Sequence, residues 1–107
     1  MFRHVVMLRF ADDTTDEQKE ALRAGLRRLP ELIPEISAYR FGDDLGLRDD
    51  NFDFVITADF DSFENYIVYR DHPDHQKAIA DLIAPIMAAR AAVQFKWAAA
   101  LPPDLPG

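Results

Sequence analysis

Alternation of apolar and polar residues predicts four strands along this chain. The clearest are residues 2–10 and 52–60, in which every second side chain of one set is apolar. Shorter alternating stretches predict strands at 35–42 and 91–98. The segment 42–51 is dense in Gly, Asp and Asn, which favour turns, so we expect it to connect two antiparallel strands.

A helix is predicted between the first two strands. Thr14 or Thr15, each followed three positions later by Glu or Gln, fits the capping box that starts a helix. Apolar residues then recur at helical spacing as far as Leu29. We expect Pro30 and Pro34 to close this helix, because proline cannot donate a backbone hydrogen bond.

A pair of helices is predicted between the last two strands. Asp61 or Ser62 can cap the first of them. Pro73 lies at the position that proline favours at the start of the second. Pro85 falls inside the second helix and is expected to kink or end it.

The order of these elements predicts an α+β fold. Strand, helix, strand, strand, helix pair and strand form a ferredoxin-like βαββαβ subunit, with a four-stranded antiparallel sheet and its helices on one face. We expect a single domain over residues 1–98, followed by a proline-rich tail at 99–107.

The sheet face away from the helices is expected to be unusually apolar for a solvated surface. Its predicted members are Val5, Met7, Tyr39, Phe41, Val55, Thr57 and Gln94. Packing two such faces about a two-fold axis removes both from water. The pattern therefore favours a homodimer over a monomer with a mildly apolar sheet face.

Composition narrows the classes of partner. The net charge of −7 argues against nucleic acid or an anionic membrane as a partner, since both require a basic surface. The chain has no cysteine, which excludes disulfides and thiolate chemistry. No apolar run has the length of a membrane span or a signal peptide, so we expect a cytoplasmic protein.

The segment Tyr69-Arg-Asp-His72-Pro73-Asp74-His75 is the best candidate for a functional site. His75 begins the apolar stripe of a helix and should point toward the sheet. His4 lies on the apolar face of the first strand, and Tyr69 can approach the same space. Two imidazoles and a phenol in one pocket would form an acid–base set, because histidine titrates near neutral pH.

Structural roles compete with this interpretation. His75 and His4 could each be buried with a backbone or water partner. His72 could cap the helix or face solvent. Tyr66 and Tyr69, three residues apart, are also typical of core aromatics.

Metal and cofactor sites are not indicated. His72, Asp74 and His75, with Asp71, could supply two ligands on one helical turn, but no third strong ligand is defined. The sequence also lacks a glycine-rich phosphate loop and the common catalytic motifs of hydrolases and zinc proteases. We therefore expect no cofactor.

Four motifs occurring in order along the chain resemble the stress-responsive A/B barrel (Dabb) family. They are His4–Phe10, Leu32–Ile36, Asn51–Val55 and Tyr69-x-x-His72-Pro73-x-His75. The resemblance covers about residues 2–97. It implies a ferredoxin-like subunit that forms a homodimeric α+β barrel, in agreement with the two-faced sheet.

The family resemblance also implies roles for individual residues. In one plant branch, which cyclises a linear polyketide without a cofactor, the positions of His75 and Tyr69 form the acid–base pair, and that of His4 lies in the first strand. This chain departs from that branch, with Phe54 in place of a pocket histidine and Leu26 in place of a helix tyrosine. These differences argue against polyketide cyclisation itself.

The leading hypothesis is a homodimeric barrel protein whose subunits each hold a small carbonyl-containing metabolite in a pocket between sheet and helices. One alternative is a cofactor-free cyclase or lyase that uses His75 and Tyr69 as its acid–base pair. Another is a stress-protective oligomer without catalysis. A cofactor-independent oxygenase shares the barrel fold, but no residue selects it. The sequence leaves open whether the protein is an enzyme.

Overall fold

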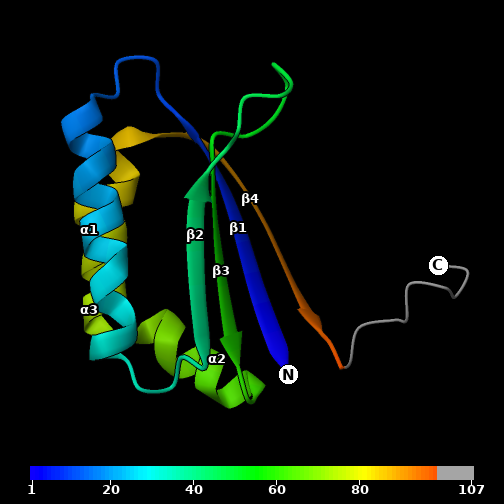
Figure 1. Cartoon of the computed structure of the whole chain (residues 1–107). Helices are drawn as coiled ribbons and strands as arrows, with labels where there is room; N and C mark the ends of the chain where they lie inside the picture. Colours follow the sequence, from blue (N-terminus) through cyan, green and yellow to red (C-terminus); the bar gives the residue numbers. More distant parts are fainter. Residues whose placement is uncertain (99–107) are drawn as a thin grey trace, which may run out of the picture.

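A four-stranded antiparallel sheet, in the order β2-β3-β1-β4, is the centre of the molecule (Figure 1). The computed structural model describes residues 1–98, so the predicted tail at 99–107 lies outside the described residues. The strands are β1 (Phe2–Phe10), β2 (Ala38–Asp43), β3 (Phe54–Phe60) and β4 (Met87–Lys96). The predicted ferredoxin-like arrangement is therefore confirmed, although β4 begins earlier than expected.

The helices lie on one side of this sheet (Figure 1). They are α1 (Asp16–Leu32), α2 (Phe63–Asp71) and α3 (Pro73–Ala78), which continues into a π-helical turn, η1 (Ile79–Ile83), and a 3-10 turn, η2 (Ala84–Ile86). Pro85 lies in the last turn, so it ends the helix as predicted. No helix among residues 1–98 is long and apolar enough to cross a bilayer. The expected cytoplasmic location stays a prediction.

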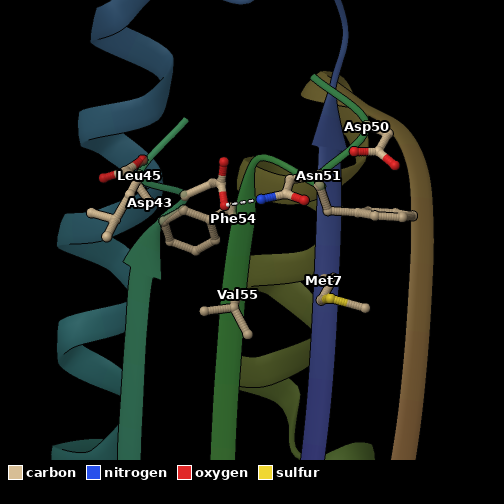
Figure 2. A pocket seen from close by; sticks show the side chains of 9 residues that line it. Met7, Asp43, Leu45, Asp50, Asn51, Phe54 and Val55 are labelled. Atoms are coloured by element: carbon tan, nitrogen blue, oxygen red, sulfur yellow. Dashed lines mark hydrogen bonds between the residues drawn. The ribbon is translucent and has the colours of Figure 1, made fainter. Parts of the chain in front are cut away.

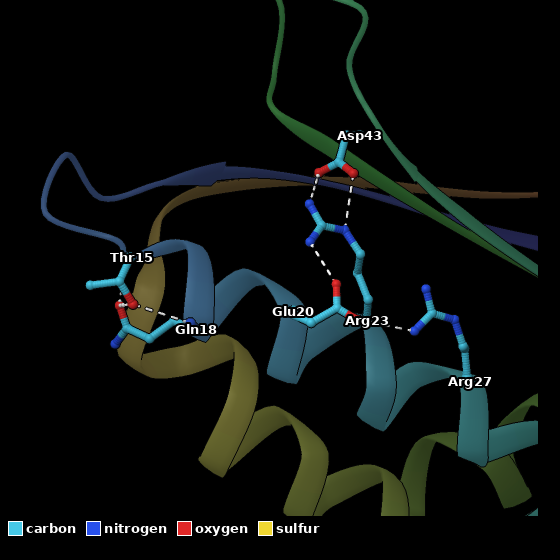
Figure 3. Close-up of polar contacts among 6 residues, drawn as sticks. All are labelled: Thr15, Gln18, Glu20, Arg23, Arg27 and Asp43. Carbon is cyan, nitrogen blue, oxygen red and sulfur yellow. Dashed lines mark hydrogen bonds and ion pairs between the residues drawn. The ribbon is translucent and has the colours of Figure 1, made fainter.

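Thr15 is the N-terminal cap of helix α1, so of the two threonines proposed from the sequence Thr15 and not Thr14 has this role (Figure 3). The Thr15 hydroxyl accepts the Gln18 backbone N–H at 3.1 Å, and the Gln18 side-chain oxygen accepts the Thr15 N–H at 2.9 Å. The end of the helix differs from expectation, because Pro30 lies inside it rather than closing it. Near a C-terminus the exposed Pro30 ring removes only one backbone bond, and the Ile33 N–H still reaches the Leu29 carbonyl.

Arg23 ties α1 to the end of β2 (Figure 3). Its guanidinium donates to both carboxylate oxygens of Asp43, at 2.9 and 3.0 Å, and a third bond reaches Glu20. Exposed ion pairs contribute at most about 1 kcal/mol each. The bidentate geometry mainly sets the orientation of the helix over the sheet.

The core forms where β1 and β3 meet α1. Every second residue of the two strands faces the helices, and three leucines of α1 pack on them. Gly25 lies on the same helix beside Leu82 of η1, and a Cβ built at Gly25 would overlap a methyl group of Leu82. The glycine therefore permits a close approach between α1 and η1. Fully buried members of the core are Leu8, Leu22, Leu26, Ile33 and Phe60.

The edge strand β2 presents the opposite face from the one predicted. Tyr39 pairs with Ala58 and Phe41 with Ile56, and both of these β3 residues face the helices. Tyr39 and Phe41 therefore pack against the core rather than on the outer sheet face. Burying two aromatic side chains removes far more apolar area from water than burying Ala38 and its neighbours would.

The prediction for β4 was also wrong by one register. Gln94 pairs with His4 and faces the helices, not the outer face. Val93 and Phe95 consequently face outward, and these residues are 55% and 44% exposed. The amide of Gln94 meets the buried imidazole of His4, which supplies the polar partner that this imidazole needs.

We predict that Thr15→Ala lowers the free energy of unfolding by about 1 kcal/mol, because it removes the capping bond at the start of α1. Thr14→Ala is the matched control. The buried Thr14 hydroxyl has no hydrogen-bond partner among residues 1–98, so its removal should cost less. Urea denaturation of both variants measures the difference, and an equal loss would contradict the assignment of the cap.

Candidate functional site

A cavity of about 240 Å³ lies between the sheet and the helices. Val6, Leu8 and Ile56 line it from the middle strands of the sheet and form the apolar part of this side. Further apolar residues line it from the helices and the turns after α3. The polar residues of the lining are His4, Tyr39, Tyr66, Tyr69, Arg70, His75, Gln76 and Arg90.

The turn between α2 and α3 positions His75. His72 caps α3, with its Nδ1 accepting the Asp74 backbone N–H at 3.1 Å, and Pro73 occupies the first helical position. The capping role was one of the alternatives left open for His72. His75 follows half a turn later, where its ring lines the cavity.

A backbone hydrogen bond sets the tautomer of His75. Its Nδ1 lies 3.0 Å from the carbonyl oxygen of Arg70. A carbonyl can only accept, so the Nδ1 carries the proton and the Nε2 of the neutral ring keeps a lone pair. Burial lowers the pKa of His75, which favours this neutral form. His75 thus has the backbone partner expected of a structural histidine, and its ring also borders the cavity.

The Tyr69 ring packs against that of His75, with centroids 4.0 Å apart and an interplanar angle of 32°. The Tyr69 side chain is 3% exposed, and its hydroxyl lies 3.4 Å from that of Tyr39. Burial raises the pKa of Tyr39 to about 12 and also raises the pKa of Tyr69. Both phenols therefore stay protonated at neutral pH. Since only one of them can donate within the pair, the other proton is available to a ligand.

His4 has the opposite tautomer from His75. The Gln94 side-chain nitrogen lies 2.8 Å from the Nδ1 of His4 and can only donate, so the proton of the neutral ring lies on Nε2. Burial lowers the pKa of His4 to about 4, and the positive charge of Arg90 acts in the same direction. The cavity is thus bordered by one imidazole that can accept a proton and one that can donate a hydrogen bond.

The three residues predicted from sequence, His4, Tyr69 and His75, line this one cavity. Their chemical roles stay predictions. Sequence reasoning missed Tyr39, Gln94 and Arg90. The signal for Tyr39 and Gln94 was the two-residue period of the edge strands, which was assigned to the wrong face.

Metal ligation is not favoured by the geometry of the predicted ligands. The Nδ1 of His72 is engaged with a backbone N–H and lies 3.7 Å from the nearer carboxylate oxygen of Asp74. Within residues 1–98, no group of three or more histidine or carboxylate side chains is arranged to hold a metal ion.

Residues 2–97 match the family model of the stress responsive A/B barrel domain, Dabb. This match covers nearly the whole chain, including the sheet, the helices and the residues that line the cavity. The protein belongs to the Dabb family, and the resemblance seen in its sequence is confirmed.

Solved structures share this fold. A dimeric ferredoxin-like protein of unknown function from Thermobifida fusca is 45% identical, with 90% of each chain covered and a TM-score of 0.83. A Dabb family protein from Mesorhizobium loti is 16% identical, with 92% of this chain and 97% of that chain covered and a TM-score of 0.76. The hydroxynitrile lyase of Passiflora edulis is 21% identical, with 94% and 96% covered and a TM-score of 0.81. A search of curated proteins finds no match.

We predict that the protein loses stability in mild acid because of His4. Between the unfolded pKa of 6.5 and the folded pKa of about 4, the unfolded chain binds a proton at His4 and the folded chain does not. The free energy of unfolding should therefore fall by about 3 kcal/mol over this range, and His75 adds to the loss. Urea denaturation across the range measures the loss.

His4→Gln removes the titrating ring and should make the decline with pH shallower. NMR titration of the histidine side chains provides an independent test. A His4 resonance that titrates with a pKa near the ordinary value of about 6.5 would contradict the prediction.

Proposed function

We propose that this chain is a homodimeric A/B barrel protein whose subunits each bind a small carbonyl-containing molecule in the inner cavity and move a proton on it. The observation that carries the proposal is the hydrogen bond from His75 Nδ1 to the Arg70 carbonyl. It leaves the Nε2 lone pair as the basic atom of a ring that borders an otherwise largely apolar cavity. A neutral imidazole held in this way is a suitable general base.

The remaining polar groups have complementary roles in this proposal. His75 Nε2 takes a proton from the ligand, from a hydroxyl or from the carbon next to a carbonyl, and later returns it. The phenol of the Tyr69–Tyr39 pair whose proton is free, together with the Nε2–H of His4, donates hydrogen bonds to the ligand oxygen as negative charge develops there. Because His75 returns to the ligand the proton that it removes, the step as proposed needs no cofactor or metal.

The low dielectric of the cavity supports the same assignment. Burial keeps both histidines neutral and both phenols protonated, so the base and the donors coexist at neutral pH. The lyase among the structural neighbours indicates that this fold can host an enzyme, although fold alone does not define activity.

The outer sheet face supports the homodimer. Val5, Met7, Val55, Val93 and Phe95 are the apolar residues of this surface, which we call the outer face. The ion pair between Arg3 and Asp59 lies beside Phe95. Figure 2 shows Met7 and Val55 projecting from neighbouring strands beside the connection of residues 44–53. A surface of this kind favours association with a second copy. The related protein of Thermobifida fusca is described as dimeric.

We predict that the wild-type protein catalyses exchange of the protons next to the carbonyl of 2-heptanone and cyclohexanone in D2O. His75→Asn should slow this exchange by roughly 10²-fold or more, because asparagine can still bond the Arg70 carbonyl but has no basic nitrogen. Proton NMR of the ketone measures the rate. His72→Asn is the matched control, since asparagine preserves the helix cap and removes an imidazole outside the cavity lining. Equal rates in wild type and His75→Asn would contradict the proposal.

We also predict a dimer with twice the 12.2 kDa mass of the chain in analytical ultracentrifugation. Val93→Lys places a charge on the outer face and should raise the dimer dissociation constant at least roughly tenfold. Val68→Lys is the matched control, because Val68 is also exposed but lies on α2. Wild-type protein that sediments as a monomer at micromolar concentration would contradict the dimer.

A further inference from the structure

Arg90 is the one arginine of the cavity lining whose charge has no partner among residues 1–98. The other one, Arg70, pairs with Asp71 at 2.9 Å. Arg90 makes no ion pair and no side-chain hydrogen bond with the described residues, although it lies on β4 facing the helices. Its exposure to solvent places it at the mouth of the cavity.

The electrostatic setting of Arg90 is unusual for this chain. The protein carries a net charge of −7, yet no Asp or Glu side chain belongs to the lining formed by residues 1–98. The charged or titratable side chains of the lining are instead arginine, histidine and tyrosine. An unpaired guanidinium beside apolar surface favours an anion, and a planar carboxylate can bond it in the bidentate manner.

The sheet register separates the backbone of Arg90 from that of His4 along the cavity. Tyr39, Ala58, His4 and Gln94 lie in one row across the four strands. Arg90 lies opposite Leu8, four residues along β4 from Gln94, which corresponds to about 13 Å between backbone positions. Val6 and Ile56 lie between the two rows and are apolar. An arginine side chain spans part of this distance, so a short apolar stem would fill the remainder.

We propose that the ligand is a small oxo acid, with a carboxylate bound by Arg90 and a carbonyl bound near His75 and Tyr69 at the end of a short apolar stem. This inference rests on the proposed function and names the class of its substrate. The cavity volume of about 240 Å³ agrees with such a molecule, because it lies below the range of roughly 300–1,000 Å³ typical for drug-sized ligands. Arg90 has a second effect, since its charge helps to keep His4 neutral.

The test uses three probes that differ only in stem length: 4-oxopentanoate, 5-oxohexanoate and 6-oxoheptanoate, each beside its primary amide. Calorimetric titration of the wild-type dimer should give at least roughly tenfold tighter binding for one or more of the acids than for the matching amide. Arg90→Gln should remove this preference by weakening the binding of the acids to about that of the amides. Added sodium chloride should weaken the binding of the acids and leave the amides unaffected.

Arg28→Gln serves as the charge-matched control, because it changes the net charge equally and lies outside the inner cavity lining on α1. Loss of acid binding in both variants, or no preference for acids in the wild type, overturns the inference. Failure of all three acids to bind at millimolar concentration also overturns it.

The two proposals fail separately in these experiments. If the wild-type protein shows no preference for acids while its proton exchange still depends on His75, only the role of Arg90 is contradicted. Acid binding that depends on Arg90, with exchange unaffected by His75→Asn, would support the oxo acid site and contradict the acid–base role.

Discussion

The two-residue period of β1 is the constraint on which the rest of the structure depends. This strand lies inside the sheet, paired with β3 on one side and β4 on the other. Alternation sends His4, Val6 and Leu8 toward the helices and Val5 and Met7 to the outer face. One strand therefore contributes both to the lining of the cavity and to the surface proposed for the dimer. A slip of one residue would exchange the two roles.

The parts of the fold that sequence reasoning predicted well are those with strong and redundant signals. In β1 and β3 one set of alternating positions is almost wholly apolar. Pro73 marks the start of α3, because proline is favoured at the first position of a helix. The edge strands were harder, since each pairs on one side only and has apolar residues on both faces. For Tyr39 and Gln94 the correct face depends on contacts with Tyr69 and His4, which are distant in sequence.

The candidate site shows a related limit. His4, Tyr69 and His75 could be grouped from sequence because each belongs to a clearly patterned element. The tautomers of the two histidines could not be predicted. That of His75 depends on a backbone carbonyl, and that of His4 depends on a side chain 90 residues away. A sequence pattern can predict which residues line the same cavity, but the direction of each hydrogen bond depends on how distant residues pack together.

Gly25 leaves room for the Leu82 side chain between two segments that also line the cavity. The missing side chain at this position lets α1 and η1 approach closely, and these same elements supply Leu26, Leu29 and Ile83 to the cavity lining. A larger residue at position 25 would have to displace the Leu82 side chain, without any change to the polar groups on the sheet. Substitution at this position would therefore act on the helical wall of the cavity through Leu82, and not through His4, Tyr69 or His75.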